Sequence, residues 1–244
     1  MQAIIMAAGK GSRLGELTGG HPKSFLEIKG RKLIEYNLEI LKKLGVTETV
    51  IVTGYRSEEF EKLLSGRKDI RIAYNPFYEL MNVVGSFYFG MEYLHDDFLY
   101  LHADTLCDPT VFRKMLSSPS DVVLPVDYKE CDDEAMKVRN ESGRIVQITK
   151  KMSLDVAEGE FIGIAFFRKS VVPALKRKVI EVLQEKRFSE YFESAVQKLI
   201  DEHAFAISAV PTDGAFWAEI DFREDYEHAC SRIPAYMADG TYGF

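Results

Sequence analysis

The sequence predicts an α/β protein with a doubly wound, mixed but mostly parallel sheet, joined to an α+β half. Three observations predict it. Up to about residue 120, short apolar runs alternate with amphipathic stretches, which is the pattern of repeated βα units. A glycine-rich loop directly follows the first apolar run, as at the carboxyl edge of a parallel sheet. Beyond residue 120 the apolar runs have short connections, which is typical of antiparallel strands.

The elements of the first half begin with a strand at 2–8. Its residues, QAIIMAA, are mostly apolar without alternation, as in a strand buried on both faces. In the helix that follows, Ile34, Leu38 and Leu41 share one face, and Gly45 ends it. The other elements expected in this half are strands at 48–54, 70–75 and 97–104 and helices near 57–65, 84–94 and 109–116. Because βα crossovers are right-handed, these helices should cover both faces of the sheet.

The second half is expected to extend the same sheet, so we predict one domain over 1–244, with a first half at 1–120 and a second at 121–244. Its expected strands are 121–128, 135–140, 143–151, 160–170, 204–211 and 215–221. Helices are expected near 170–186, 188–202 and 223–233.

The composition argues against several classes of protein. A formal net charge of −7 disfavours a general affinity for nucleic acid or for a membrane surface. The first apolar run is too short for a membrane span and lacks the basic flank of a signal peptide, so a cytoplasmic location is expected. Cys107, Cys131 and Cys230 have neither the number nor the spacing of a disulfide framework or a zinc site.

The loop MAAGKGSRL, residues 6–14, contains two glycines, a serine and two cations but no acid. Gly9 and Gly11 leave room for backbone N–H groups to approach a ligand, and such groups bind anions. The loop matches neither the Walker motif nor the dinucleotide motif. By itself it is equally well explained as a glycine-rich turn with solvated Lys10 and Arg13.

A longer block, MAAGKGSRLGELTGGHPKSFLEIKGRKLIEYNLEIL at residues 6–41, resembles the N-terminal signature of the nucleotidyltransferases that make NDP-sugars and CDP-alcohols. Later landmarks of that family follow in order at 75–86, Asp104, 133–138, 143–151, 159–167, 191–195 and 217–229. The set is most similar to the bacterial CTP:phosphocholine cytidylyltransferase type, which makes precursors of cell-surface polymers or lipids. The resemblance implies a Rossmann-like nucleotidyltransferase fold with a nucleotide-binding first half and an acceptor-binding second half.

The resemblance also implies a reaction, in which a phosphate monoester attacks the α-phosphorus of a nucleoside triphosphate and pyrophosphate leaves. The monoester is already largely dianionic (second pKa about 6), so the site must supply positive charge and alignment rather than a base. The backbone of Gly9, Gly11 and Ser12 would cradle the triphosphate. Arg13 would hold the pyrophosphate, and Lys23 would lie beside the α-phosphate. The alternative is that Lys23 is a solvated loop lysine. On either interpretation we expect its side chain to be exposed.

For the base, the resemblance implies contacts from the backbone of Ala8 and the side chains of Asn82 and Ser86. An amide and a hydroxyl can satisfy the edge of a pyrimidine, and CTP is favoured over UTP or dTTP. Asn82 and Ser86 also stand at the start of a predicted helix, so either is alternatively a helix cap.

Magnesium is the expected cofactor, because Mg²⁺ is usually bound by one or two protein carboxylates together with phosphate oxygens of the substrate. Asp104 and Asp221, with Glu219 close by, are the expected ligands at the ends of two strands. Strand-terminal aspartates are alternatively caps or turn residues, and Asp108 is assigned a capping role. The family usually has glycine where His102 and the following alanine stand, and His102 is interpreted as a packed strand residue.

The acceptor is implied to lie against the second half, with its phosphate at Lys150 and its alcohol or sugar at Glu160, Tyr191, Glu193 and Trp217. Aromatic faces and carboxylates suit a trimethylammonium or ammonium group, which favours phosphocholine, although Tyr191 is alternatively a core residue. Ethanolamine phosphate, aminoethylphosphonate and polyol phosphates remain open as acceptors. A sugar-1-phosphate nucleotidylyltransferase and a non-catalytic nucleotide-binding relative are the alternative functions, and a homodimer is left open.

Overall fold

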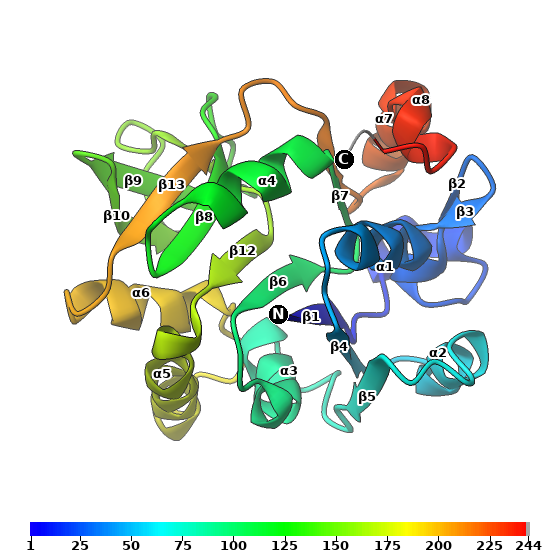
Figure 1. Cartoon of the computed structure of the whole chain (residues 1–244), viewed down its shortest axis with the longest axis horizontal. Coiled ribbons are helices and arrows are strands. Elements are labelled where there is room, and N and C mark those ends of the chain that lie inside the picture. Colours follow the sequence, from blue (N-terminus) through cyan, green and yellow to red (C-terminus); the bar gives the residue numbers. More distant parts are fainter. Residues whose placement is uncertain (243–244) are drawn as a thin grey trace.

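The structure of the chain, a computed structural model, describes residues 1–242. Within these residues ten strands form one sheet that crosses the molecule (Figure 1). The strands are β1 (Gln2–Ala7), β4 (Glu48–Thr53), β5 (Ile70–Tyr74), β6 (Phe98–His102), β8 (Val122–Asp127), β9 (Lys137–Glu141), β10 (Arg144–Thr149), β11 (Gly159–Phe161), β12 (Ile164–Phe167) and β13 (Ile207–Pro211). Their order across the sheet is β11-β9-β10-β13-β8-β12-β6-β1-β4-β5. The mixed α/β sheet that the sequence predicts is thereby confirmed.

The helices follow the predicted sequence of elements closely. They are α1 (Leu33–Lys43), α2 (Ser57–Leu63), α3 (Val83–Gly90), α4 (Pro109–Ser117), α5 (Val172–Gln184), α6 (Glu193–Asp201), α7 (Arg223–Arg232) and the short α8 (Ala235–Ala238). The helix predicted at 188–202 begins only at Glu193, and α8 has no predicted counterpart. Asp108 caps α4 as predicted, because its carboxylate accepts a hydrogen bond from the N–H of Thr110 at 2.8 Å.

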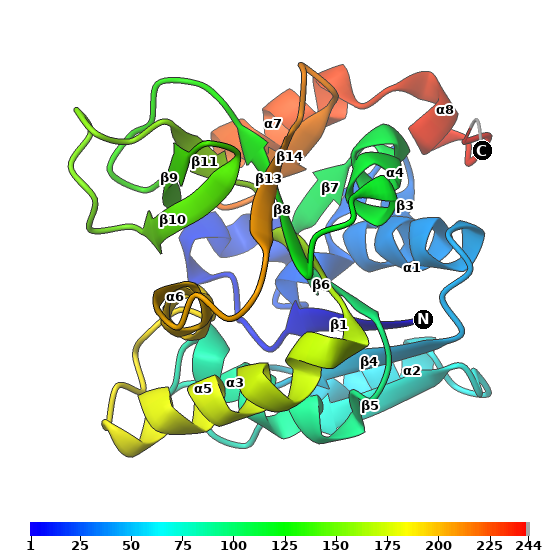
Figure 2. The ribbon, with the colours of Figure 1, turned by 60° about the vertical axis from the view of Figure 1, so that its left-hand side comes forward.

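The central strand is buried on both faces because its side chains alternate between two hydrophobic cores. In β1, Ala3 and Ile5 belong to a core that includes residues of α1 and α4. Ile4 and Met6 belong to a second core, which includes residues of α3, α5 and α6. Figure 2 shows α1 and α4 along one side of the sheet and α3 and α5 along the other. The doubly wound arrangement is therefore also confirmed.

Parallel pairing dominates the first half of the sheet only. Strands β5, β4, β1 and β6 are all parallel, and Ile4 of β1 lies opposite both Val50 and Tyr100. In the second half, β12 is antiparallel to both β6 and β8, whereas β8 and β13 are parallel. The carboxyl ends of β1, β4 and β6 thus meet at one edge of the sheet, which is where α/β proteins form ligand sites.

Gly163 divides the strand predicted at 160–170 into β11 and β12. Its φ is +75°, and a Cβ atom there would lie 2.6 Å from Nδ1 of His102, so a side chain is excluded. The N–H of His102 donates to the carbonyl of Gly163 at 2.9 Å. The break lets β11 pair with β8, where Glu160 lies opposite Asp127.

Two short strands, β7 (Thr105–Cys107) and β14 (Trp217–Glu219), form a separate antiparallel pair. Glu219 lies opposite Thr105, and the N–H of Ile220 donates to the carbonyl of Asp104 at 3.1 Å. Because β6 ends at His102, Asp104 lies in the turn between β6 and β7 and not at the end of a sheet strand, which corrects the predicted boundary. This pair brings Asp104 next to the segment 219–221. A further small pair is formed by β2 (Glu27–Ile28) and β3 (Arg31–Lys32).

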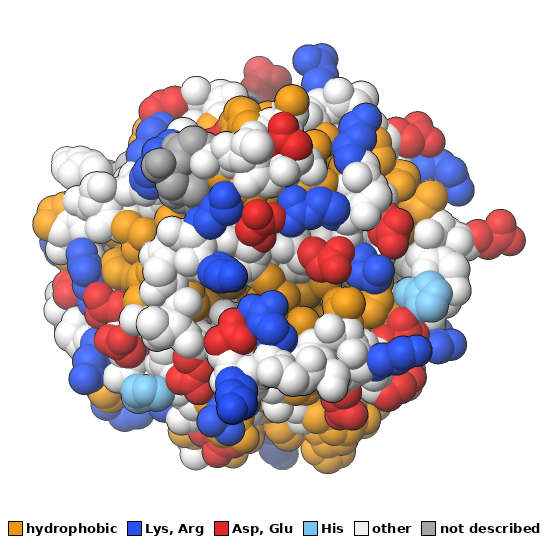
Figure 3. Space-filling view, turned by 45° about the vertical axis from the view of Figure 1, so that its right-hand side comes forward, with side chains coloured by type: hydrophobic (Ala, Val, Ile, Leu, Met, Phe, Trp, Pro, Cys, Tyr) orange, Lys and Arg blue, Asp and Glu red, His pale blue; other side chains and the backbone are white. Residues whose placement is uncertain are grey.

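The surface view in Figure 3 shows basic and acidic side chains interspersed on one face, with hydrophobic side chains between them. This face lacks the continuous basic surface that general nucleic-acid binding requires. Over residues 1–242, every helix is too short or too polar to cross a bilayer. The three cysteines are free, as the sequence predicts.

Candidate active site

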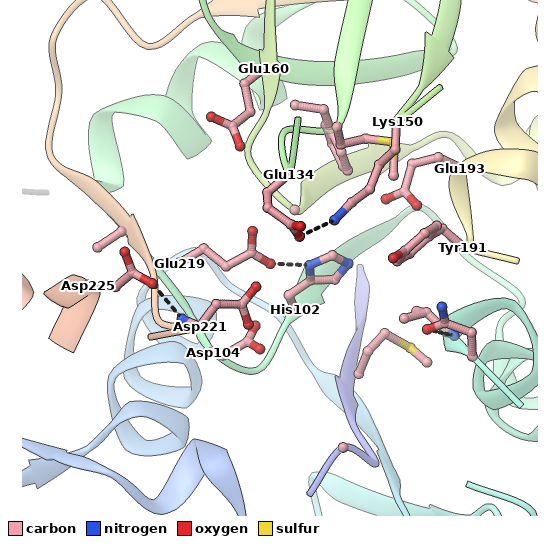
Figure 4. A pocket seen from close by; sticks show the side chains of 18 of the residues that line it. His102, Asp104, Glu134, Lys150, Glu160, Tyr191, Glu193, Glu219, Asp221 and Asp225 are labelled. Atoms are coloured by element: carbon pink, nitrogen blue, oxygen red, sulfur yellow. Dashed lines mark hydrogen bonds and ion pairs between the residues drawn. The ribbon is translucent and has the colours of Figure 1, made fainter. Parts of the chain in front are cut away.

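A cleft of about 800 Å³ is lined by residues from both halves of the chain. It contains most of the predicted site residues: Ala8, Gly9, Arg13, Asn82, Ser86, Asp104, Lys150, Glu160, Tyr191, Glu193, Trp217, Glu219 and Asp221. In the close view of Figure 4, Asp104, Glu219 and Asp221 lie on one side of the cleft and Lys150, Tyr191 and Glu193 on the other. The predicted residues Gly11, Ser12 and Lys23 are not part of the lining of the cleft.

The glycine-rich loop is shaped to accommodate Lys23. Gly11 has a φ of +69°, and a Cβ atom at this position would lie 2.9 Å from Cβ of Lys23. Glycine is favoured at such a φ, and its missing side chain lets Lys23 pack against the loop. Ser12 begins a 3₁₀ helix, Ser12–Thr18, directly after Gly11. The role of this backbone as a phosphate cradle stays a prediction.

Lys23 is buried, with 9% of its surface exposed, so the expectation of an exposed loop lysine is wrong. Its Nζ lies 2.6 Å from Oδ2 of Asp104 and also forms an ion pair with Asp221. Burial acts to lower the pKa of Lys23, but the two carboxylates outweigh it and raise this pKa above its usual range. Burial likewise favours the neutral form of Asp104, but Lys23 outweighs it and lowers the pKa of Asp104. A charged lysine is buried here because it is paired on two sides.

Arg13 and Lys150, the cations assigned to two different phosphate groups, share one carboxylate. Oε2 of Glu134 lies 3.6 Å from the Arg13 guanidinium and 3.7 Å from Nζ of Lys150. Arg13 also lies 3.5 Å from Oδ2 of Asp221 and over the ring of Phe222, at 5.3 Å from its centroid. These pairs are partly solvent-exposed and therefore weak, so the Glu134 carboxylate can be released from both cations at little cost in free energy.

The two aspartates fit a hard divalent cation. Both converge on Nζ of Lys23, so their oxygens lie within reach of a single positive centre. Oδ1 of Asp104 is buried and has no hydrogen-bond partner, which leaves a carboxylate oxygen free for a ligand. Asp225 fixes the backbone at Asp221 by accepting a hydrogen bond from its N–H at 2.9 Å (Figure 4). Carboxylate oxygens are the donors that Mg²⁺ prefers.

His102 lies at the end of β6 as expected, but its imidazole lines the cleft and so does more than pack the strand. Its Nδ1 lies 2.9 Å from Oε1 of Glu219, and its Nε2 lies 2.9 Å from the hydroxyl of Tyr100. Burial opposes protonation of His102, but the hydrogen bond and charge of Glu219, with Glu193, raise its pKa to about 9. His102, Asp104 and Glu219 offer ligand atoms within 4.8 Å of one another, so the contact with His102 holds Glu219 beside Asp104.

The raised pKa of His102 predicts a pH dependence of stability. Because its pKa rises from 6.5 to about 9 on folding, its contribution to stability is complete below pH 6.5 and is lost as the pH rises through about 9. In chelator, the free energy of unfolding of the wild type should therefore decline over this range relative to His102→Gln. Denaturant titrations at several pH values measure this difference, and parallel pH profiles of the two proteins would contradict it.

Asn82 and Ser86 both line the cleft and both have structural partners. Asn82 caps α3, where its Oδ1 accepts a hydrogen bond from the N–H of Val83 at 2.8 Å, and its Nδ2 donates to the carbonyl of Ser189 at 3.1 Å. Ser86 is buried and accepts a hydrogen bond from Nδ2 of Asn75 at 3.0 Å. The capping alternative is thus confirmed for Asn82, and the contact of both residues with a base stays a prediction.

The predicted acceptor residues lie together in the cleft. Nζ of Lys150 lies 4.9 Å from the centroid of the Tyr191 ring. Trp217 donates from Nε1 to Asp127 at 3.1 Å. Glu193 is 2% exposed and its Oε1 has no hydrogen-bond partner. Burial raises the pKa of Glu193. The structure therefore brings these side chains together, and their contact with an acceptor stays a prediction.

Five further aspartate, glutamate or lysine residues of the cleft are missing from the predicted set: Asp127, Lys129, Asp132, Glu134 and Asp225. Lys129 lies 2.8 Å from Oε2 of Glu160, and Glu134 contacts Arg13 and Lys150 as described above. All of them except Asp225 fall in the charged run DYKECDDE, residues 127–134. Such a run between two predicted strands usually forms a solvated loop, so its pattern alone does not indicate a position in the cleft.

Comparisons with known proteins identify the family and the fold of the chain. Residues 3–199 match the family described as "MobA-like NTP transferase domain". The chain is 29% identical to the CTP:phosphoglutamine cytidylyltransferase of Campylobacter jejuni, over 93% of this chain and 98% of that protein. Among solved structures, the CTP:phosphocholine cytidylyltransferase of Streptococcus pneumoniae superimposes with a TM-score of 0.81 at 25% identity, covering 96% of this chain and 99% of that one. The inositol-1-phosphate CTP transferase of T. maritima superimposes with a TM-score of 0.75 at 26% identity, covering 98% and 93%.

Proposed function

The chain belongs to the MobA-like NTP transferase domain family, and from this premise we propose that it transfers CMP from CTP to a small phosphorylated alcohol with release of pyrophosphate. One observation carries the proposal: Lys23, Asp104 and Asp221, which are far apart in the sequence, meet beside a cleft that both halves of the chain line. The CTP-dependent relatives described above, which act on three different phosphorylated compounds, support the nucleotide and the class of acceptor.

The chemistry of the reaction suits these residues. The attacking phosphate monoester is largely dianionic at neutral pH, so no side chain has to remove a proton from it. The site has to offset the repulsion between this dianion and the triphosphate and to align the two. Lys150 would bind the acceptor phosphate, Arg13 the departing pyrophosphate and Lys23 the α-phosphate. Glu134, which bridges Arg13 and Lys150 in the free protein, would give way to the phosphates.

We also propose that the reaction depends on magnesium. Asp104 and Asp221 would hold the ion, and Glu219, which contacts His102, lies beside Asp104. A bound Mg²⁺ would neutralise phosphate charge as it develops on the leaving group. Lys23 would keep the Asp104 carboxylate ionised, because its ammonium lowers the pKa of Asp104 against the effect of burial, and its ion pairs would orient both aspartates.

The proposed function is tested by a screen of pyrophosphate release. Each of the four common nucleoside triphosphates is combined with a panel of phosphorylated alcohols and sugar 1-phosphates. Release only with CTP and a phosphorylated alcohol is the expected result. Release with a sugar 1-phosphate instead would favour a sugar-nucleotide enzyme, and no release with any pair would favour a non-catalytic nucleotide-binding protein.

The stacking of Lys150 on Tyr191 leads to a prediction about the acceptor. Tyr191→Ala should raise the KM for the acceptor by about 3- to 30-fold, since a cation–π contact contributes roughly 0.5 to 2 kcal/mol. The KM for CTP should hardly change, because Tyr191 belongs to the second half of the chain. Tyr191→Phe retains an aromatic face and serves as the control. Steady-state kinetics with each substrate varied in turn measures the split, and an equal rise in both KM values would contradict it.

A further inference from the structure

We call the part of the cleft formed by Glu160, Tyr191, Glu193 and Trp217 the head-group subsite. Lys129 of the chain itself lies within this subsite. Its Nζ lies 2.8 Å from Oε2 of Glu160 and 3.8 Å from Oδ2 of Asp127. It also lies 4.8 Å from the centroid of the Trp217 ring. This ammonium group therefore makes the contacts, an aromatic face and a carboxylate, that a cationic head group would need.

The second aromatic ring of the subsite is covered as well. Nζ of Lys150 lies 4.9 Å from the centroid of Tyr191. Both aromatic rings of the subsite thus have a lysine of the chain itself against a face. A trimethylammonium group binds to proteins through such faces, so it would have to displace one of these lysines. Displacing Lys129 would take from Glu160 the cation that pairs with it.

One carboxylate oxygen of the subsite has no hydrogen-bond partner. Glu193 is 2% exposed, lines the cleft, and its Oε1 accepts no hydrogen bond within residues 1–242. A buried polar atom of this kind is stabilised by a ligand that donates a hydrogen bond to it. A hydroxyl or amide group can donate, whereas a quaternary ammonium has no N–H or O–H.

We propose that Lys129 is a specificity-determining residue, because its own ammonium group supplies the positive charge of the head-group subsite. The subsite therefore takes an acceptor with an uncharged, hydrogen-bonding head group rather than a quaternary ammonium. This inference rests on the proposed function, because it concerns the acceptor of that same reaction. Among phosphorylated alcohols, a subsite with Lys129 in place selects the polyol-like acceptors over phosphocholine.

Three acceptors of similar size distinguish the effect of a charged head group from the effect of hydrogen-bond donors in the head group. Phosphocholine is cationic and has no donor in its head group, phosphoethanolamine is cationic with N–H donors, and glycerol 3-phosphate is uncharged there with O–H donors. With the wild-type chain and CTP, kcat/KM should be highest for glycerol 3-phosphate and lowest for phosphocholine, with about a tenfold difference or more between them. Isothermal titration calorimetry of each compound with the wild type should give the same order of affinity.

Removing the charge of Lys129 should change this order. Lys129→Met keeps most of the length of the side chain but removes the ammonium group from the Trp217 face and from Glu160. It should raise kcat/KM for phosphocholine by about tenfold and lower that for glycerol 3-phosphate, while the KM for CTP stays unchanged. Lys129→Arg retains the charge and should retain the wild-type order. Both variants should fold, since the side chain of Lys129 is 46% exposed.

Two results would overturn the inference. One is a wild type that binds and uses phosphocholine best, which would mean that Lys129 merely fills the site until a cationic acceptor displaces it. The other is an order of acceptors that is the same in wild type, Lys129→Met and Lys129→Arg. Absence of CMP transfer to all three compounds would instead contradict the proposed function, and the calorimetric order of binding would still decide whether Lys129 selects the head group.

Discussion

Lys23→Ala is expected to lower kcat by a factor of roughly 10² to 10³, because it removes a charge-assisted contact to a group that becomes more negative in the transition state. The structure adds a second reason for a large effect. Lys23 forms ion pairs with both Asp104 and Asp221, so its loss leaves two carboxylates facing each other without their shared cation. Both the phosphate contact and the orientation of the aspartates are then lost.

The same substitution should also affect stability, in contrast to what an exposed lysine would do. Breaking a buried, paired charge is expected to lower the free energy of unfolding by about 1 to 3 kcal/mol. Lys10→Ala is the matched control, because Lys10 is an exposed lysine of the same loop, and its Nζ lies over the ring of Tyr55 at 5.6 Å from the centroid. Urea titrations establish that Lys23→Ala is folded, and kinetics on the folded variant then measures kcat. Half of the wild-type kcat in folded Lys23→Ala would exclude Lys23 from the reaction.

Asp104→Asn and Asp221→Asn are each expected to lower kcat by at least about 10²-fold, since each removes a charged ligand of the proposed magnesium ion with little change in shape. Activity of the wild type should require Mg²⁺ or Mn²⁺ and disappear in excess chelator. Each variant should need a higher concentration of Mg²⁺ for half-maximal activity than the wild type does.

Asp213→Asn provides the control for loss of a carboxylate, because the side chain of Asp213 is 63% exposed and pairs with Lys114 away from the cleft. Calorimetry with Mg²⁺ in the presence of CTP gives a readout that does not depend on turnover. Full activity of the wild type in chelator, or unchanged Mg²⁺ dependence in both aspartate variants, would contradict the metal assignment.

The elements of the fold could be predicted from the sequence because their signals are local. The apolar run of β1, the shared face of Ile34, Leu38 and Leu41 in α1, and the cap of α4 at Asp108 each depend on residues within a few positions of one another. The resemblance to nucleotidyltransferases in turn located Arg13 and Asp221, which do line the cleft. Their chemical roles remain predictions.

Only the tertiary structure decided which residues that are distant in the chain come into contact. Lys23 and Asp221 are separated by 198 positions and meet because β7 pairs with β14, and neither strand indicates the other through its own pattern. For the same reason Lys129 and Glu134 could not be distinguished from solvated loop residues. A charged side chain in a polar loop is equally compatible with water and with a buried partner, and only the fold brings the partner within ion-pair distance.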